Sequence, residues 1–132
     1  MNQDLDYNSD FYSFKEQIVN KFGEIYFEQA EIFFERAIAM AKNGFLYNAI
    51  SDGQFALELT NYANDNKGVT SIIGFISQLY FDLGKIKKAY AYYELGIGLL
   101  DKESEFYEED IELFRRLKEL IDSENWKDDL SD

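Results

Sequence analysis

Acidic side chains near the C-terminal end are the residues whose types and spacing best suit chemistry. They form two clusters, EEDIE at 108–112 and ELID at 119–122. Paired carboxylates bind divalent cations or transfer protons. The chain has no histidine and no cysteine, which excludes imidazole catalysis, thiol nucleophiles, disulfides and the usual zinc sites. Magnesium chemistry on carboxylates is therefore the enzymatic candidate to weigh.

The two clusters resemble the EExxE and ExxD carboxylates of all-α nucleotide pyrophosphohydrolases of the MazG type, which bind magnesium. That family places the two elements on facing helices. Here only six residues separate them, so both fall on one helix. A run of acids at a helix N-terminus is more typical of a solvated face. The sequence therefore favours a protein that is not an enzyme, with no metal and no cofactor, and leaves the hydrolase as a minor alternative.

Two other motifs have simpler interpretations. GIG at 96–98 follows no strand and lies inside a helical pattern, so it lacks the geometry of a nucleotide loop. Lys85, Lys87 and Lys88 form a basic cluster at a helix start. Such a run is typical of a solvated turn, and contact with an acidic partner segment is the alternative.

The elements that carry these residues are predicted to be helices. The chain has no proline and is rich in helix-forming and aromatic residues, which suits an all-α fold. Its 132 residues are the size of one domain. We therefore predict a single domain over 1–132. The spacing of its apolar residues predicts the helices within it. Its parts are an N-terminal helix over 9–22 that ends near Gly23, helix pairs over 24–63 and 69–101, a capping helix over 104–122 and an acidic tail over 123–132.

Small residues recur at matching places in the two helix pairs. Gly44 is followed by Ala49 and Ala56, and forty residues later Gly84 is followed by Ala89 and Gly96. Two antiparallel helices approach closely only where the turn is permissive and small side chains lie at the crossing. We therefore expect Ala89 to be a buried contact between paired helices.

The second pair resembles the tetratricopeptide repeat, whose helix pairs carry an aromatic residue, a turn glycine, alanine, a second aromatic and a small residue. Those places are filled in order by Tyr80, Gly84, Ala89, Tyr93 and Gly96. In the first pair Met40 and Gly53 replace the two aromatics. The 40-residue period is similar to a longer variety of the repeat, over about residues 24–103. The resemblance implies antiparallel hairpins stacked as a short TPR-like α-solenoid of about five or six helices. Two repeats are fewer than stability requires, so capping helices are expected at both ends.

The resemblance also implies a protein-binding groove lined by the first helix of each pair. The family's groove positions correspond to Glu31, Phe34, Ile38 and Lys42 in the first unit, and to Ser71, Gly74, Phe75, Gln78, Phe81 and Asp82 in the second. The lysine, asparagine and arginine clamp of the chaperone-binding subgroup is absent from these positions. Four apolar side chains with an acidic rim suit an amphipathic segment that carries Lys or Arg. Burial of the same side chains against the first or last helix is the alternative.

Net charge narrows the choice of partner. A charge of -13 argues against nucleic acid and anionic membranes, which bind clustered Lys and Arg. The acidic start of the chain lacks the pattern of a signal peptide and no apolar run reaches membrane-spanning length, so a cytoplasmic protein is expected. We expect a non-catalytic interaction module, an adaptor or a small chaperone, that binds a protein or peptide. The alternative is a homodimer formed through the exposed ends of the short array.

Overall fold

The structure, a computed structural model, describes residues 3–63 and 68–124 and the side chains of 22–62 and 68–124. Regular structure in these ranges is entirely helical and contains no strand. The five helices are α1 (Gln3–Lys42), α2 (Leu46–Ala63), α3 (Val69–Asp82), α4 (Ile86–Gly98) and α5 (Tyr107–Asp122). The predicted all-α class is confirmed for these residues. The expected acidic tail lies outside them from residue 125 onward.

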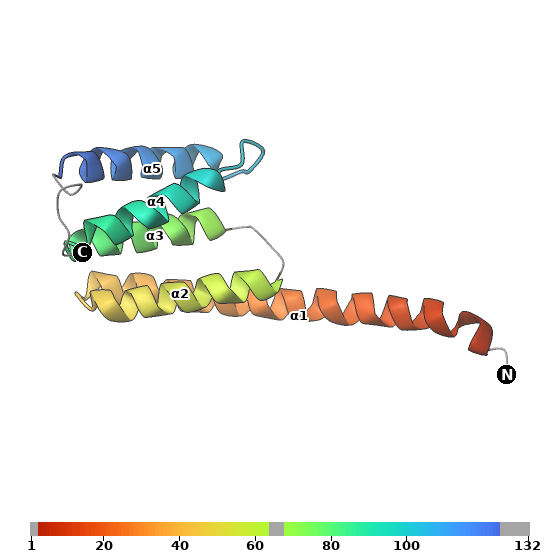
Figure 1. The fold of residues 1–132 in the computed structure, drawn as a ribbon. Helices are drawn as coiled ribbons and strands as arrows, with labels where there is room; N and C mark the ends of the chain where they lie inside the picture. The colour runs from red at the N-terminus through yellow and green to blue at the C-terminus, as the bar shows by residue number, and fades with distance from the viewer. Residues whose placement is uncertain (1–2, 64–67, 125–132) are drawn as a thin grey trace.

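The helices stack in chain order (Figure 1). α1 packs on α2 and α3 packs on α4, each pair joined by a short turn, while α2 also contacts α3. α5 lies on the opposite side of the second pair, where it contacts both α3 and α4. The first pair and α5 therefore cover the two sides of the second pair.

α1 is longer than expected. It runs for 40 residues through Gly23, so the predicted break between a helix over 9–22 and the next helix is wrong. A glycine inside a helix costs only about 1 kcal/mol relative to alanine, and no proline is present to stop the helix. The same helical spacing of apolar residues continues on both sides of Gly23. No helix in the described part of the chain, α1 included, has the length and apolar character needed to cross a membrane.

The turns after α1 and α3 have the same backbone geometry. Each contains a glycine with positive φ, 86° at Gly44 and 77° at Gly84. In each, the amide of the residue after the glycine donates to the carbonyl five residues earlier, at 2.9 Å. This is the Schellman arrangement, in which the left-handed glycine lets the last helical carbonyls find donors. A side chain at either glycine would be strained.

Small residues lie where the paired helices cross. Ala49 and Ala89 are completely buried, and the buried Ser77 hydroxyl donates to the Ala89 carbonyl at 2.7 Å. The expected helix contact at Ala89 is therefore confirmed. Gly96 has a different reason to be small: a Cβ there would overlap Phe114 of α5 and come within 3.2 Å of Ile73. Its size admits the next helix as well as the paired one.

Two groups of buried side chains form the core. The larger group joins α1, α2 and α3, and includes Ala37, Ala56 and Ile76, each fully buried. The smaller group joins α3 to α5 through Ile73, Phe114 and Leu117. The larger group holds α1, α2 and α3 together. It therefore fixes the positions of the exposed faces of α1 and α3.

Candidate functional site

The expected groove positions form two parallel rows on α1 and α3. Glu31 and Lys42 are exposed and Ile38 is half-buried on α1. On α3, Gln78 is half-buried and Asp82 is exposed. A 40-residue offset relates the two rows, and each row precedes a turn with the same backbone hydrogen bonds.

Two aromatic residues form the floor between the rows. The rings of Phe34 and Phe75 meet edge to face, with centroids 5.3 Å apart and planes at 83°. Both rings also pack against the larger core group and are half-buried. Phe34 and Phe75 were both predicted to line the groove for a ligand. Part of each ring packs between α1 and α3.

α5 covers the N-terminal part of the second row. Gly74 is buried, and a Cβ at this position would come within 2.5 Å of Leu113 Cδ2. The Ser71 hydroxyl donates to an Asp110 carboxylate oxygen at 3.0 Å. Gly74 therefore belongs to the packing of α3 on α5, and the prediction that it lines an open groove is wrong. A glycine is needed here because α5 approaches the α3 backbone directly.

Burial sets the charge behaviour of Asp110. Its carboxyl group is removed from water, which raises its pKa above the ordinary value, and nearby Glu109 raises it further, while the hydrogen bond from Ser71 acts in the opposite direction. Desolvation is the largest of these effects because a charge is less stable in a low-dielectric environment. Asp110 is thus a packing residue of the α3–α5 contact.

Phe81 occupies a different environment from the two floor aromatics. Phe81 is half-buried, and it belongs to neither of the two core groups of the described residues. Next to it on the same face, the Gln78 amide donates to Asp82 at 3.0 Å. Phe81 is therefore an aromatic residue that the core does not use, at the end of α3 near the turn.

A small apolar pocket lies at the other end of the groove. Its volume is about 290 Å³. Helices α1, α2 and α3 and the segment before α5 contribute its lining: Phe27, Ala30, Glu31, Phe34, Thr60, Gly68, Ile72, Glu105 and Phe106. Only Glu31 and Phe34 of this set were predicted. Glu105 and Phe106 line the pocket from the segment between α4 and α5, which no local sequence signal indicates.

The pocket combines apolar walls with acidic edges. Phe27 and Phe34 are half-buried, and Phe106 is 39% exposed. Glu31 and Glu105 are both exposed, so each carboxylate stays hydrated beside the apolar walls. This combination accepts an apolar side chain flanked by a cation, since the cation meets a carboxylate without either charge losing water fully.

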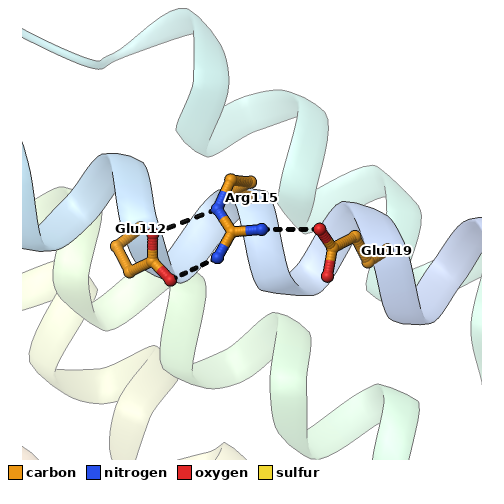
Figure 2. Close-up of polar contacts among 3 residues, drawn as sticks. All are labelled: Glu112, Arg115 and Glu119. Carbon is orange, nitrogen blue, oxygen red and sulfur yellow. Dashed lines mark hydrogen bonds and ion pairs between the residues drawn. The ribbon is translucent and has the colours of Figure 1, made fainter.

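The acidic clusters of α5 are engaged by cations of the same helix (Figure 2). The guanidinium of Arg115 donates to Glu112 through two nitrogens, at 2.5 and 3.0 Å, and to Glu119 at 2.6 Å. Lys118 donates to Asp122 at 2.8 Å. The Arg115 hydrogen bonds hold the pKa of Glu112 below its ordinary value. In the described ranges no group of three or more acidic side chains is arranged to hold a metal ion.

The basic cluster after Gly84 borders the second pair. The Lys88 ammonium lies 5.6 Å from the centre of the Tyr80 ring, within range of a cation–π contact. Tyr80 in turn stacks on Tyr92 with ring centres 5.6 Å apart. This lysine is therefore associated with its own helix pair.

In comparison with known proteins, no family model, no curated protein and no solved structure matches this chain.

Proposed function

We propose that this chain is a non-catalytic protein-interaction module, an adaptor or a small chaperone, which binds an amphipathic, net-basic peptide or helix across α1 and α3. The single observation that carries this proposal is the apolar pocket between Phe27, Phe34 and Phe106, with Glu31 and Glu105 at its edges. The pocket opens at one end of a row of positions that ends, at the other, at half-buried Phe81.

The architecture that we propose is a short TPR-like solenoid. In it, α1–α2 and α3–α4 are two units of 40 residues, and α5 is the C-terminal cap. The equivalent turns at Gly44 and Gly84 and the buried alanines at positions 49 and 89 support this assignment. A stack of this kind turns the first helix of each unit toward one face, which is the face that carries the pocket.

The chemistry of the pocket defines the ligand. A leucine- or phenylalanine-sized side chain buried there would contribute about 1.5–3 kcal/mol. A lysine or arginine one helical turn away would meet Glu31 or Glu105, and exposed pairs of this kind contribute about 0.2–1 kcal/mol each. The net charge of -13 accelerates encounter with basic ligands and disfavours acidic ones.

A peptide pair tests the proposal. The probe is a fluorescent amphipathic helical peptide of Leu and Lys, and its matched control carries Glu in place of Lys. We expect fluorescence anisotropy to detect binding of the Lys peptide only. Glu31→Lys with Glu105→Lys should weaken that binding about tenfold or more, and Phe106→Ala should weaken it without changing the helical content.

A charge-matched variant excludes general attraction to an acidic protein. Glu58→Lys with Glu94→Lys makes the same change in net charge at exposed positions of α2 and α4, away from the pocket. It should bind the Lys peptide nearly as well as the unmodified chain. Equal weakening by both double variants would mean that the peptide reads only net charge, and the proposed site would be wrong.

A further inference from the structure

The N-terminal half of α1 extends beyond the rest of the molecule (Figure 1). α1 has 40 residues and α2 has 18. Near the end of α2, the Tyr62 ring lies 5.5 Å from that of Tyr26, so α2 reaches α1 only as far as this contact. Residues 3–21 of α1, about 28 Å of helix at 1.5 Å per residue, therefore have no helix of the described chain beside them.

A helix of this composition gains little stability by itself. Residues 3–21 contain no alanine and are rich in aromatic, β-branched, serine, asparagine and aspartate residues, which are weak helix formers. Most helices in proteins are stabilised by packing an apolar face rather than by intrinsic propensity. We therefore expect the extended half of α1 to be stabilised by packing against another helix.

The sequence of α1 predicts an apolar stripe on one side of the helix, from residue 11 to residue 32. Phe11, Ile18, Ile25 and Ile32 recur every seven residues in the sequence, and a seven-residue spacing keeps positions on one side of a helix. Where side chains are described, the stripe is open: Ile32 is 62% exposed and Ile25 38%. Phe22, on the same side, is 53% exposed.

The stripe continues onto the edge of α2. Phe55 is 43% exposed and Tyr62 is 69% exposed. Each rests on an aromatic residue of α1, Phe55 on Phe33 with ring centres 4.6 Å apart, and Tyr62 on Tyr26. The outer face of the first pair thus exposes apolar side chains of both helices, interrupted by Arg36, whose guanidinium lies 4.9 Å from the centre of the Phe33 ring, and no other helix of the described chain packs on it.

We infer that a second copy of this chain covers this face, and that the two copies pair through antiparallel α1 helices. The stripe is nearly symmetric about residue 22. An antiparallel pair centred there places Phe11 of one copy opposite Ile32 of the other, and Ile18 opposite Ile25. Each extended half then lies on the packed half of the partner, as an isologous two-fold interface requires.

Charge selects the antiparallel arrangement. Residues 11–22 carry Lys15, Lys21 and one glutamate, a net of +1, whereas residues 21–32, which lie opposite them in this register, carry Lys21 and three glutamates, a net of -2. The antiparallel pair sets the weakly basic segment of each copy along the acidic segment of the other. A parallel pair would set the two acidic segments side by side, where like charges repel.

The interface is separate from the proposed peptide site. Ile32 and Phe34 project from different sides of α1, since two residues along a helix turn the side chain by about 200°. Phe34 contacts Phe75 on α3, whereas Ile32 is exposed. A dimer would therefore leave the pocket open, and either proposal can fail without the other.

Mass measurement with matched variants is the first test. Light scattering coupled to size exclusion should give twice the chain mass of 15.5 kDa. Ile32→Glu should raise the dimer dissociation constant about 100-fold, because each copy contributes one such residue to the interface. Ile97→Glu, at a position of α4 that is 41% exposed, should leave the mass unchanged. A monomer for the unmodified chain, or equal effects of the two variants, would overturn the inference.

A spin-label distance tests the orientation. The chain has no cysteine, so Ser9→Cys gives one label per copy. Antiparallel pairing about residue 22 places the two labels about 40 Å apart, whereas parallel pairing places them about 10 Å apart. A double electron–electron resonance distance near 40 Å in the dimer is the expected result. A short distance would show that α1 pairs in parallel and would overturn the antiparallel arrangement.

Discussion

The first and second helix pairs have the same turn but fill their interiors differently. In the first pair, Gly53 of α2 leaves room for Ile76 of α3, with a Cβ there only 3.1 Å from Ile76 Cγ1. At the equivalent place in the second pair, Tyr93 lies against Phe114 of α5, with ring centres 5.9 Å apart. Three residues later the first pair has the larger side chain, because Ala56 in the first pair corresponds to Gly96 in the second.

The two pairs therefore share the backbone geometry of the turn but differ in the volumes of their interior side chains. The turn depends on the positive φ of its glycine. Neighbouring side chains can therefore change without altering the turn, as long as φ stays the same. The interior depends on the helix that arrives next, and each position must match that helix in volume. The second pair accepts a phenylalanine from α5, whereas the first accepts an isoleucine from α3.

Removal of Phe114 should produce the largest change. Its side chain is 1% exposed and joins α5 to both helices of the second pair. Phe114→Ala should lower the free energy of unfolding by about 3–5 kcal/mol, measured by urea denaturation. Phe106→Ala, on the segment before α5, should cost much less because Phe106 is 39% exposed. Similar losses for both would mean that α5 is held by its surface rather than by this ring.

A methyl group at Gly96 should have the next largest effect. Gly96→Ala places a Cβ against the buried Phe114 ring, so overpacking should destabilise the protein by about 1–3 kcal/mol. Helix propensity acts in the opposite direction by about 1 kcal/mol.

Gly98→Ala is the matched control in the same helix. A Cβ at Gly98 meets no atom within 4 Å, so only propensity acts and this variant should be neutral or slightly more stable. If Gly96→Ala were also stabilising, Phe114 could move aside, and the difference between Gly96 and Ala56 would have no packing cause.

The hydroxyl of Ser77 offers a smaller comparison, because the first pair has Ala37 at the equivalent position. Both side chains are fully buried, but only Ser77 donates to a carbonyl of the paired helix, Ala89 O. Ser77→Ala should therefore cost about 0.5–1.5 kcal/mol. Thermal unfolding measures it. A change within error would mean that the two pairs hold together equally well without this bond.

Much of the fold could be predicted because it depends on local signals. The glycines at the two turns, the absence of proline and the helical spacing of apolar residues indicate where helices end. The same approach failed at Gly23, since a glycine inside a helix is a small cost that a strong pattern on both sides outweighs. Local signals therefore locate turns well but overestimate isolated glycines.

The candidate site was harder to predict because it depends on which helix comes next. The resemblance to the tetratricopeptide repeat implied a row that contains Glu31 and Phe34, but it could not reveal that α5 covers Gly74. It also missed Glu105 and Phe106, since the path of the chain between α4 and α5 brings them to the pocket. A residue that borders a pocket through a distant loop leaves no periodic signal.

Two buried carboxylates give the smallest and most specific comparison, because they respond to acid in opposite directions. In the first pair, Arg36 donates to both oxygens of Asp52, at 2.7 Å each, and holds the Asp52 pKa below its ordinary value. At the contact of α3 with α5, burial raises the Asp110 pKa. Both residues are 8% exposed, but the Arg36 hydrogen bonds outweigh desolvation at Asp52, whereas the Ser71 hydrogen bond does not outweigh it at Asp110.

The two shifts have opposite consequences for stability. The contribution of Asp52 is complete above the ordinary aspartate pKa and is lost as the pH falls through its lower folded-state pKa. The contribution of Asp110 is complete below the ordinary pKa and is lost as the pH rises through its raised folded-state pKa. Acidification therefore weakens the first pair at Asp52 and strengthens the α3–α5 contact at Asp110.

Two amide variants separate these effects. Urea unfolding of the unmodified chain, Asp52→Asn and Asp110→Asn should be compared at neutral pH and at about pH 3, below the ordinary aspartate pKa. The stability advantage of the unmodified chain over Asp52→Asn should shrink on acidification, because the ion pair is lost as Asp52 gains its proton. Relative to Asp110→Asn, the unmodified chain should gain stability on acidification, since protonation removes a buried charge that asparagine never carries. Differences that move in the same direction would show that Asp110 is stabilised as a charge by the Ser71 hydroxyl and the N-terminus of α5, so that its hydrogen bond outweighs its burial.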